Sequence, residues 1–370
     1  MIYRDLGRTG LKVSQLGFGA MRLPMQGEGP QARVDRALAL PMFQRAFAAG
    51  VNYIDTAVGY CNQDSQRAVG DALQACRDRI VVSTKNPCYS ADEREWWTNL
   101  ENSLERLRVT SIDLYNHHGL NWKLYTEAVA PRLSRWMQRA KDQGLIQHIG
   151  CSFHDNNEGL RRIVDTGYVE VITLQYNLLD RQLEDGIAYA RSQGVGVVVM
   201  GPVGGGRFGV PNPVLAALVP GVQAVPELAL RFVLSRPAVT VALSGMSTLA
   251  HVEENLKVAA DPVSLTAAQQ QQIDEHLVRL RKMADLYCTG CRYCLPCESG
   301  VDIPAVFDLY NRGRVYGFWA AARAAYRGLV QNKKDAEICR DCGACEEKCP
   351  QHLPIRRQLQ EARAALQPAP

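Results

Sequence analysis

Eight short apolar runs, separated by stretches with helical spacing, constrain this sequence of 370 residues more than any other feature. The runs are 13–19, 51–55, 80–85, 112–117, 146–152, 169–175, 195–200 and 239–244. Most are nearly continuous in valine, isoleucine or leucine, which is typical of strands buried on both faces of a parallel sheet. Segments with helical spacing lie between them, at 33–49, 64–76, 94–107, 127–143 and 225–234.

Repeated strand–helix units imply parallel strands joined by right-handed crossovers. Eight units within roughly 240 residues fit a (β/α)8 TIM barrel, whose usual size is about 250 residues. The alternative is an open doubly wound sheet, which would carry a G-x-G-x-x-G turn after its first strand. Here Gly17-Phe18-Gly19 continues as Ala20 and Met21 without that pattern. The sequence therefore predicts an α/β protein built on a barrel.

Composition excludes several classes of function. The net charge is +4 and charges of both signs are interspersed, which gives no electrostatic case for binding nucleic acid or an anionic membrane. No stretch approaches the ~20 apolar residues that a membrane span needs. The first residues lack the pattern of a secretory signal, so we expect a cytoplasmic protein with reduced thiols. The twelve cysteines are then expected to be ligands or reactive groups instead of disulfides.

Eight of these cysteines fall in two short runs near the C-terminus. The first run contains Cys288, Cys291, Cys294 and Cys297, and the second contains Cys339, Cys342, Cys345 and Cys349, which is followed by Pro350. The second run has the C-x2-C-x2-C-x3-C-P spacing of bacterial ferredoxins, in which the fourth cysteine binds the other cluster. The spacing predicts two [4Fe–4S] clusters.

Exchange of the fourth ligands gives two predicted ligand sets. Cys349 would complete the first three cysteines of the first run, and Cys297 would complete the first three of the second run. The first run departs from the pattern, because its last gap is two residues and Pro296 precedes Cys297. Two zinc sites are the alternative, but zinc usually takes C-x2-C pairs some 15–20 residues apart.

Composition changes abruptly at Tyr287, and we place the domain boundary there, with domains at 1–286 and 287–370. Both cysteine runs are followed by a similar tail, at 301–304 and 353–355, which suggests a pseudo-duplicated unit. The segments 303–310 and 318–330 between them have helical spacing. The second domain resembles helical ferredoxin domains, so we expect a small, mostly α-helical ferredoxin-like fold.

Four residues that suit proton transfer lie at or just after the carboxyl ends of three successive predicted strands. They are Asp55, Tyr60, Lys85 and His118. Active sites of barrels are built at this face. A phenol near its reference pKa of about 10 is a weak acid at neutral pH, and a nearby ammonium lowers that pKa. A carboxylate beside the lysine would keep the ammonium charged and in place.

Residues 3–260 resemble the aldo-keto reductase superfamily. The resemblance is carried by Tyr53-Ile-Asp55-Thr-Ala, Ser83-Thr-Lys85, Asp113-Leu-Tyr-Asn-His-His118 and shorter motifs around residues 13–19, 149–152 and 174–177. It implies that Tyr60 protonates the carbonyl oxygen, that Lys85 and Asp55 tune Tyr60, and that His118 orients the carbonyl. His118 is preferred to His117 because members of the superfamily place this histidine five residues after the aspartate that matches Asp113.

The resemblance also implies NADP(H) or NAD(H) as cofactor. Ser152 and Gln175 match positions that hold the nicotinamide carboxamide, and Met200 stands where many relatives stack an aromatic ring. The remaining expected cofactor contacts are Gly19, Gly204, Gly205, Gly206, Arg207, Glu254 and Asn255. The usual basic residues for a 2′-phosphate are missing from 244–255, which leaves the choice between NADP and NAD open.

The leading hypothesis is an oxidoreductase acting on a small-molecule carbonyl or alcohol, fused to a domain with two [4Fe–4S] clusters. Hydride transfer moves two electrons whereas each cluster passes one, so either the clusters relay electrons, or they are structural, or an unrecognised cofactor sits in the barrel. A relay would require a redox partner protein. The alternative hypothesis is an electron-transfer iron–sulfur protein whose barrel has lost or altered its catalysis.

Overall fold

The structure is a computed structural model that describes residues 1–74, 76–204, 219, 222, 224–261, 265–285, 294–349 and 353–367. The chain divides into two compact units, Met1–Gly206 with Pro226–Leu265, and Arg207–Val225 with Thr266–Pro370. Helix α11 (Ala267–Asp285) groups with the second unit, although we had placed it before the predicted boundary at 286. The two predicted domain ranges stay a prediction.

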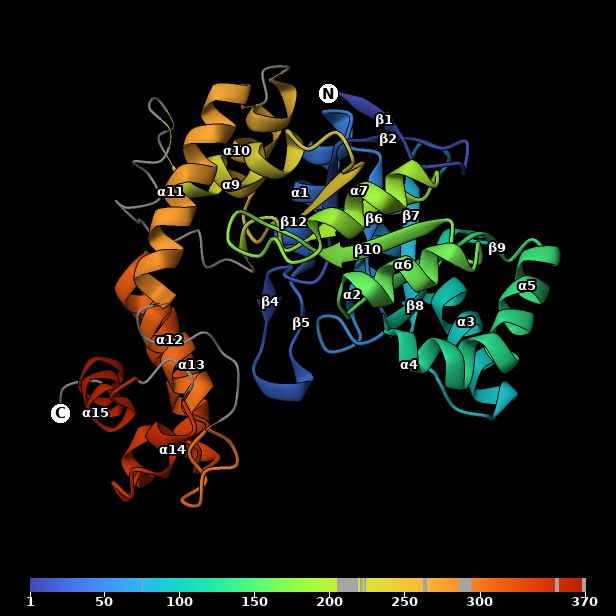
Figure 1. Cartoon of the computed structure of the whole chain (residues 1–370). Coiled ribbons are helices and arrows are strands. Elements are labelled where there is room, and N and C mark those ends of the chain that lie inside the picture. Colours follow the sequence, from blue (N-terminus) through green and yellow to red (C-terminus); the bar gives the residue numbers. More distant parts are fainter. Residues whose placement is uncertain are drawn as a thin grey trace. The chain divides into compact units, whose positions relative to one another are not determined.

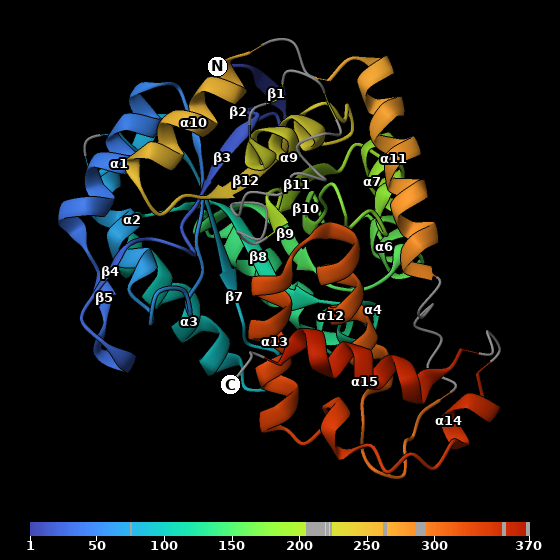
Figure 2. The same ribbon diagram turned by 90° about the vertical axis from the view of Figure 1, so that its left-hand side faces the viewer.

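The first unit is a closed barrel of eight parallel strands, as the sequence predicts. In spatial order the strands are β3 (Leu16–Gly19), β6 (Tyr53–Asp55), β7 (Val81–Asn86), β8 (Ile112–Leu120), β9 (Ile146–Phe153), β10 (Val171–Gln175), β11 (Gly196–Met200) and β12 (Val241–Gly245). Figures 1 and 2 show helices around these strands. These helices are α1 (Arg36–Ala48), α2 (Ser65–Leu73), α3 (Glu93–Leu107), α5 (Ser134–Asp142), α6 (Asn157–Asp165), α7 (Glu184–Ser192), α9 (Val225–Leu234) and α10 (Leu249–Ala260).

Two helices differ from the sequence prediction, one in where it begins and one in its type. The predicted helix at 33–49 begins three residues late, because β5 (Arg33–Val34) pairs with β4 (Met25–Gln26) and the Asp35 carboxylate caps α1. The predicted helix at 127–143 is a π-helical turn (Tyr125–Leu133) followed by α5. The π-helical turn contains Pro131, which cannot donate a backbone hydrogen bond.

A short hairpin contributes to the apolar core inside the barrel. Strands β1 (Tyr3–Asp5) and β2 (Lys12–Ser14) pair antiparallel, so the predicted run 13–19 is divided between β2 and β3. The hairpin residues Leu6 and Val13 join barrel residues in one cluster of buried side chains: Tyr53, Val81, Leu114, Val171, Val198, Val241 and Leu243. A Cβ at Gly17 would lie 2.7–3.1 Å from atoms of Val241, Leu243 and Tyr53, so these side chains need a glycine there.

The second unit is α-helical in the part that the structure describes, which confirms the predicted class. After α11 it contains α12 (Ile303–Tyr316), α13 (Trp319–Gln331), α14 (Ala344–Glu347) and α15 (Ile355–Leu366). Its core contains apolar residues of α12, α13 and α15, among them Phe307, Tyr326 and Leu359, and it includes two predicted cluster ligands, Cys294 and Cys349. Among the described helices of the chain, none is both long enough and apolar enough to cross a membrane.

Candidate functional site

The carboxyl ends of the barrel strands bring several of the predicted catalytic and cofactor residues to one rim. Strand register pairs Gly19 with Asp55, Asp55 with Ser83, and Gln175 with Met200. Because neighbouring parallel strands end on the same side, residues far apart in sequence share this layer. The rim is therefore the candidate active site of the first unit.

A buried ion pair lies at the centre of this rim. The Lys85 Nζ lies 2.5 Å from the Asp55 Oδ1 and also donates to the carbonyl oxygen of Thr56 at 2.8 Å. Both side chains are buried, with 1% of Lys85 and 4% of Asp55 exposed. Burial by itself lowers the pKa of Lys85, but Asp55 and Tyr60 raise it, and the net pKa lies above the usual value. Lys85 is therefore a permanent cation at neutral pH.

Tyr60 lies in the loop after β6, next to this cation. The Lys85 Nζ is 4.8 Å from the centroid of the Tyr60 ring. Burial raises the pKa of the Tyr60 phenol and outweighs the lowering by Lys85, so the net pKa is above its ordinary value. We had expected the ammonium to lower this pKa overall; the lowering is present but smaller than the cost of desolvating a phenolate. Tyr60 is thus a protonated phenol at neutral pH, beside a fixed positive charge.

The two adjacent histidines of β8 lie on opposite faces of the strand. The His118 ring stands edge-on to Tyr60, with centroids 6.0 Å apart, whereas the His117 Nε2 is 2.9 Å from the hydroxyl of Tyr168. Side chains alternate along a strand, so only one of two neighbours can point into the barrel. Burial, with help from Lys85 and His154, lowers the pKa of His118 to about 4. The histidine beside Tyr60 is therefore neutral at pH 7.

Burial of both histidines predicts acid sensitivity. Burial lowers the pKa of His117 to about 3, whereas an unfolded histidine titrates near 6.5. As the pH falls, histidines of the unfolded chain therefore bind protons at a higher pH than the same histidines in the folded chain. The free energy of unfolding should fall as the pH drops from about 6.5 towards 4. In His117→Gln we expect this slope to be shallower by up to about 1.4 kcal/mol per pH unit. Urea unfolding followed by tryptophan fluorescence at several pH values would measure it, and equal slopes in both proteins would contradict it.

Several predicted cofactor residues keep hydrogen-bonding capacity at the rim. Ser152 Oγ accepts from the backbone N–H of Gly119 at 2.8 Å, which leaves its own hydroxyl hydrogen unused among the described residues. The Gln175 amide has no hydrogen-bond partner in the described part of the chain, and it lies against Gly201, where a Cβ would approach it to 2.5 Å. A primary amide and a hydroxyl with spare capacity fit a carboxamide such as that of nicotinamide.

The other predicted cofactor residues differ in the element that carries them and in how exposed they are. Met200 ends β11, and Gly204 follows it with a positive φ. Asn255 is buried and donates to Ser244 Oγ at 2.8 Å, whereas Glu254 is exposed on α10. The predicted contacts Gly205, Gly206 and Arg207 lie outside the described residues.

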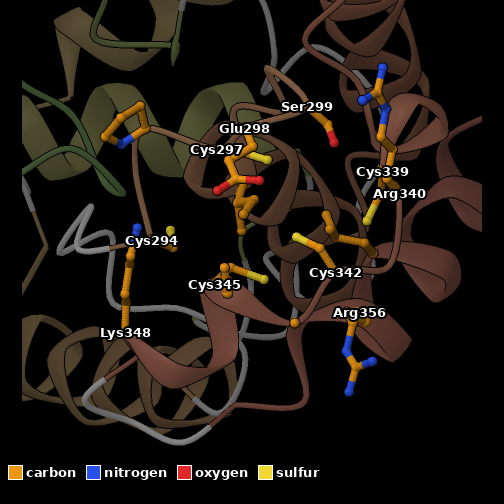
Figure 3. Close-up of a pocket in the computed structure, with 15 residues that line it drawn as sticks. Cys294, Cys297, Glu298, Ser299, Cys339, Arg340, Cys342, Cys345, Lys348 and Arg356 are labelled. Atoms are coloured by element: carbon orange, nitrogen blue, oxygen red, sulfur yellow. The ribbon is translucent and has the colours of Figure 1, made fainter.

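The second unit contains a cavity lined by cysteines (Figure 3). Five cysteines line it, namely Cys294, Cys297, Cys339, Cys342 and Cys345, and Figure 3 shows their sulfur atoms. The exchange of fourth ligands assigned Cys297, Cys339, Cys342 and Cys345 to one cluster and Cys294 to the other. Of the first four, Cys342 is exposed and the other three are partly buried, so one edge of this cavity reaches the surface. The donor set and its arrangement fit a [4Fe–4S] cluster.

The loop that carries three of these cysteines is held by local contacts. Gly343 has a φ of 81° and Asp341 a φ of 58°, and this left-handed backbone turns the chain between cysteines. Glu346 accepts from the backbone N–H of Arg356 at 2.9 Å and pairs with its guanidinium at 2.9 Å, which ties the loop to α15. Sequence reasoning missed this pair, because no spacing rule connects residues ten positions apart across a loop.

The ligands predicted for the other cluster are only partly described. Cys294 and Cys349 are both buried in the core of the second unit, while Cys288 and Cys291 lie outside the described residues. Within the described ranges, no three His, Cys, Asp or Glu side chains are grouped to hold a single metal ion. Thiolates of a [4Fe–4S] cluster bind different iron atoms, whereas the four ligands of zinc must converge on one point.

Comparison with known proteins gives the same two parts. A model of the aldo/keto reductase family matches residues 15–210 and 219–278, and a model of the 4Fe-4S dicluster domain matches residues 287–353. L-galactose dehydrogenase of Arabidopsis thaliana is 30% identical over 296 residues, which cover 72% of this chain and 91% of that protein. The NADH-specific methylglyoxal reductase of Escherichia coli is 28% identical over 220 residues, which cover 54% and 66%.

A solved structure agrees with these matches. An aldo-keto reductase from Bacillus halodurans in its holo form superposes with a TM-score of 0.63 at 28% identity, covering 75% of this chain and 96% of that one. The chain therefore belongs to the aldo/keto reductase family and carries a C-terminal 4Fe-4S dicluster domain. It is an oxidoreductase of that family.

Proposed function

We propose that the barrel catalyses nicotinamide-linked reduction of a small carbonyl compound, or oxidation of the matching alcohol, with Tyr60 as the general acid. The observation that carries this proposal is the grouping of Tyr60, Lys85, Asp55 and His118 at one rim of the barrel. Bound NADP(H) or NAD(H) would supply or accept the hydride.

The chain's own residues would handle the proton and the position of the substrate. The Tyr60 hydroxyl donates its proton to the carbonyl oxygen, and the adjacent Lys85 ammonium stabilises the phenolate that remains. Asp55 holds Lys85 in place, and His118, neutral at pH 7, can donate a hydrogen bond to the same oxygen. In alcohol oxidation the proton moves in the opposite direction.

We further propose that the C-terminal domain holds two [4Fe–4S] clusters with the exchanged ligand sets. Cys297, Cys339, Cys342 and Cys345 would hold one, and the cavity that they share, which Cys294 also lines, supports this set. Cys288, Cys291, Cys294 and Cys349 would hold the other. Bound clusters would supply one-electron transfer, and the exposed Cys342 makes the first cluster accessible to a redox partner protein.

An assay of the purified holoprotein tests both parts. We expect oxidation of NADH or NADPH in the presence of aldehydes, with methylglyoxal and aldoses in the panel because of the relatives' activities. Iron and acid-labile sulfide should both approach eight per chain. Intact clusters without turnover on either cofactor would contradict the reductase proposal and favour the electron-transfer alternative. Zinc in place of iron would contradict the cluster proposal.

A further inference from the structure

A chain of buried polar side chains continues from Asp55 away from Lys85, into the interior of the barrel. The Ser83 hydroxyl donates to Asp55 Oδ2 at 2.8 Å, while Lys85 occupies Oδ1. The Asn116 Nδ2 donates to Ser83 Oγ at 3.0 Å. Ser83 and Asn116 have no exposed surface. Each oxygen of the carboxylate therefore has a donor of its own.

Asn116 determines which way the Ser83 hydroxyl points. Its amide also donates to the carbonyl oxygen of Thr84 at 2.9 Å, so both of its N–H groups are engaged and its orientation is fixed. Because Ser83 Oγ accepts from Asn116, the hydroxyl hydrogen is left to donate to Asp55. Gly150 makes room for this arrangement, since a Cβ there would lie 2.4 Å from Asn116 Oδ1.

We propose that Ser83 and Asn116 are positioning residues that hold the Asp55 carboxylate in the orientation required to keep the Lys85 ammonium beside Tyr60. The catalytic role of these two residues rests on the proposed function. Their effect on the ion pair of Asp55 and Lys85 does not. In the described part of the chain, the side-chain hydrogen bonds of Ser83 and Asn116 run to each other, to Asp55 and to Thr84, and none runs to Tyr60. They would act only through Asp55.

Burial explains why such support is needed. At an exposed site water would hydrate a carboxylate oxygen that lost its donor, but Asp55 is 4% exposed and Ser83 is not exposed at all. Without the Ser83 hydroxyl, the carboxylate is free to rotate about its side-chain bond and the short contact with Lys85 loosens. A weaker partner then stabilises the buried ammonium less, and the pKa of Lys85 falls.

Titration of Lys85 by NMR on lysine labelled with 13C at Cε tests the inference without any need for activity. The Lys85 signal would be assigned with Lys85→Met. In Ser83→Ala we expect the pKa of Lys85 to fall by about one unit or more. Asn116→Leu keeps the shape but removes the donor, so we expect a smaller fall in the same direction. The double variant should match Ser83→Ala alone, because Asn116 would act through Ser83.

Thr84→Val is the matched control. Thr84 is equally buried on the same strand, but its hydroxyl accepts from Gln66 and makes no contact with Asp55. We expect this variant to leave the Lys85 pKa unchanged. An unchanged Lys85 pKa in both Ser83→Ala and Asn116→Leu would overturn the inference, as would an equal fall in Thr84→Val. If Ser83→Ala does not fold, Asn116→Leu decides the question alone.

Turnover separates this inference from the proposed function. Where the wild type reduces an aldehyde, Ser83→Ala should lower kcat several-fold with little change in KM, because a displaced ammonium stabilises the Tyr60 phenolate less, although Lys85 itself stays charged at neutral pH. A wild type without turnover whose Lys85 pKa still falls in Ser83→Ala would refute the catalytic proposal and leave the positioning role in place.

Discussion

Replacing Tyr60 with phenylalanine is expected to lower kcat/KM for aldehyde reduction by about 10²–10⁴-fold, the usual contribution of a general acid. The variant loses one oxygen atom and keeps the ring that packs against His118 and Lys85. Iron content and the visible spectrum should be unchanged, because the cysteine cavity is built entirely from the second unit. Steady-state kinetics of the same preparations, together with iron analysis, would measure both quantities.

A second tyrosine provides the control for Tyr60→Phe. The Tyr3 hydroxyl donates to the carbonyl oxygen of Gly50, in the β1–β2 hairpin outside the rim. Tyr3→Phe also removes one tyrosine hydroxyl but should leave turnover within about twofold, since loss of one exposed hydrogen bond costs only about 1 kcal/mol of stability. Full activity in Tyr60→Phe would contradict the assignment of this residue as the acid.

Replacing Cys345 with serine is expected to remove one of the two proposed clusters and leave the other. Iron and sulfide should fall by about half, because a serine hydroxyl is a much poorer ligand for iron than a thiolate. Cys297→Ser should behave in the same way, since Cys297 lines the same cavity although it belongs to the first cysteine run. Metal analysis and low-temperature EPR of the reduced proteins would measure the cluster content.

The two variants combined test the exchange of ligands. If Cys297 and Cys345 hold the same cluster, the double variant should keep about half of the iron, like each single variant. If each run bound its own cluster, the double variant would lose nearly all of it, and the exchanged sets would be wrong. Cys76→Ser is the control, because Cys76 is a partly buried thiol of the first unit, and burial raises its pKa away from the ligand form.

The regular part of the fold could be predicted because each strand and helix carries its own pattern. Runs of valine and isoleucine indicated eight buried strands, and all eight are present in the closed barrel. The β4–β5 pair was missed because it comprises only two residues per strand, too short for a periodic signal. The sequence also could not predict that α11 belongs to the second unit, because that grouping depends on contacts with residues far away in sequence.

The candidate site, too, could be predicted only in part from the sequence. Because side chains alternate along a strand, the sequence could predict that Ser83 and Lys85 lie on the same face of β7. It could not predict that the Ser83 hydroxyl would donate to Asp55. The resemblance to relatives selected His118, and the strand geometry now places His117 against Tyr168 on the other face. Spacing alone could not separate two adjacent histidines, because either could face inward until the register of β8 was known.

The sequence by itself determined the class of fold, the presence of cluster-binding cysteines and the residues that could move a proton, because periodicity and ligand spacing are local properties. Only the tertiary structure decided which of these residues meet. It placed Cys294 and Cys297 with Cys339, Cys342 and Cys345 in one cavity, and it supplied Asp55 with a hydrogen-bonded chain through Ser83 and Asn116. The two contacts of this hydrogen-bonded chain join positions 28 and 33 residues apart. They arise because barrel closure brings distant strand ends together.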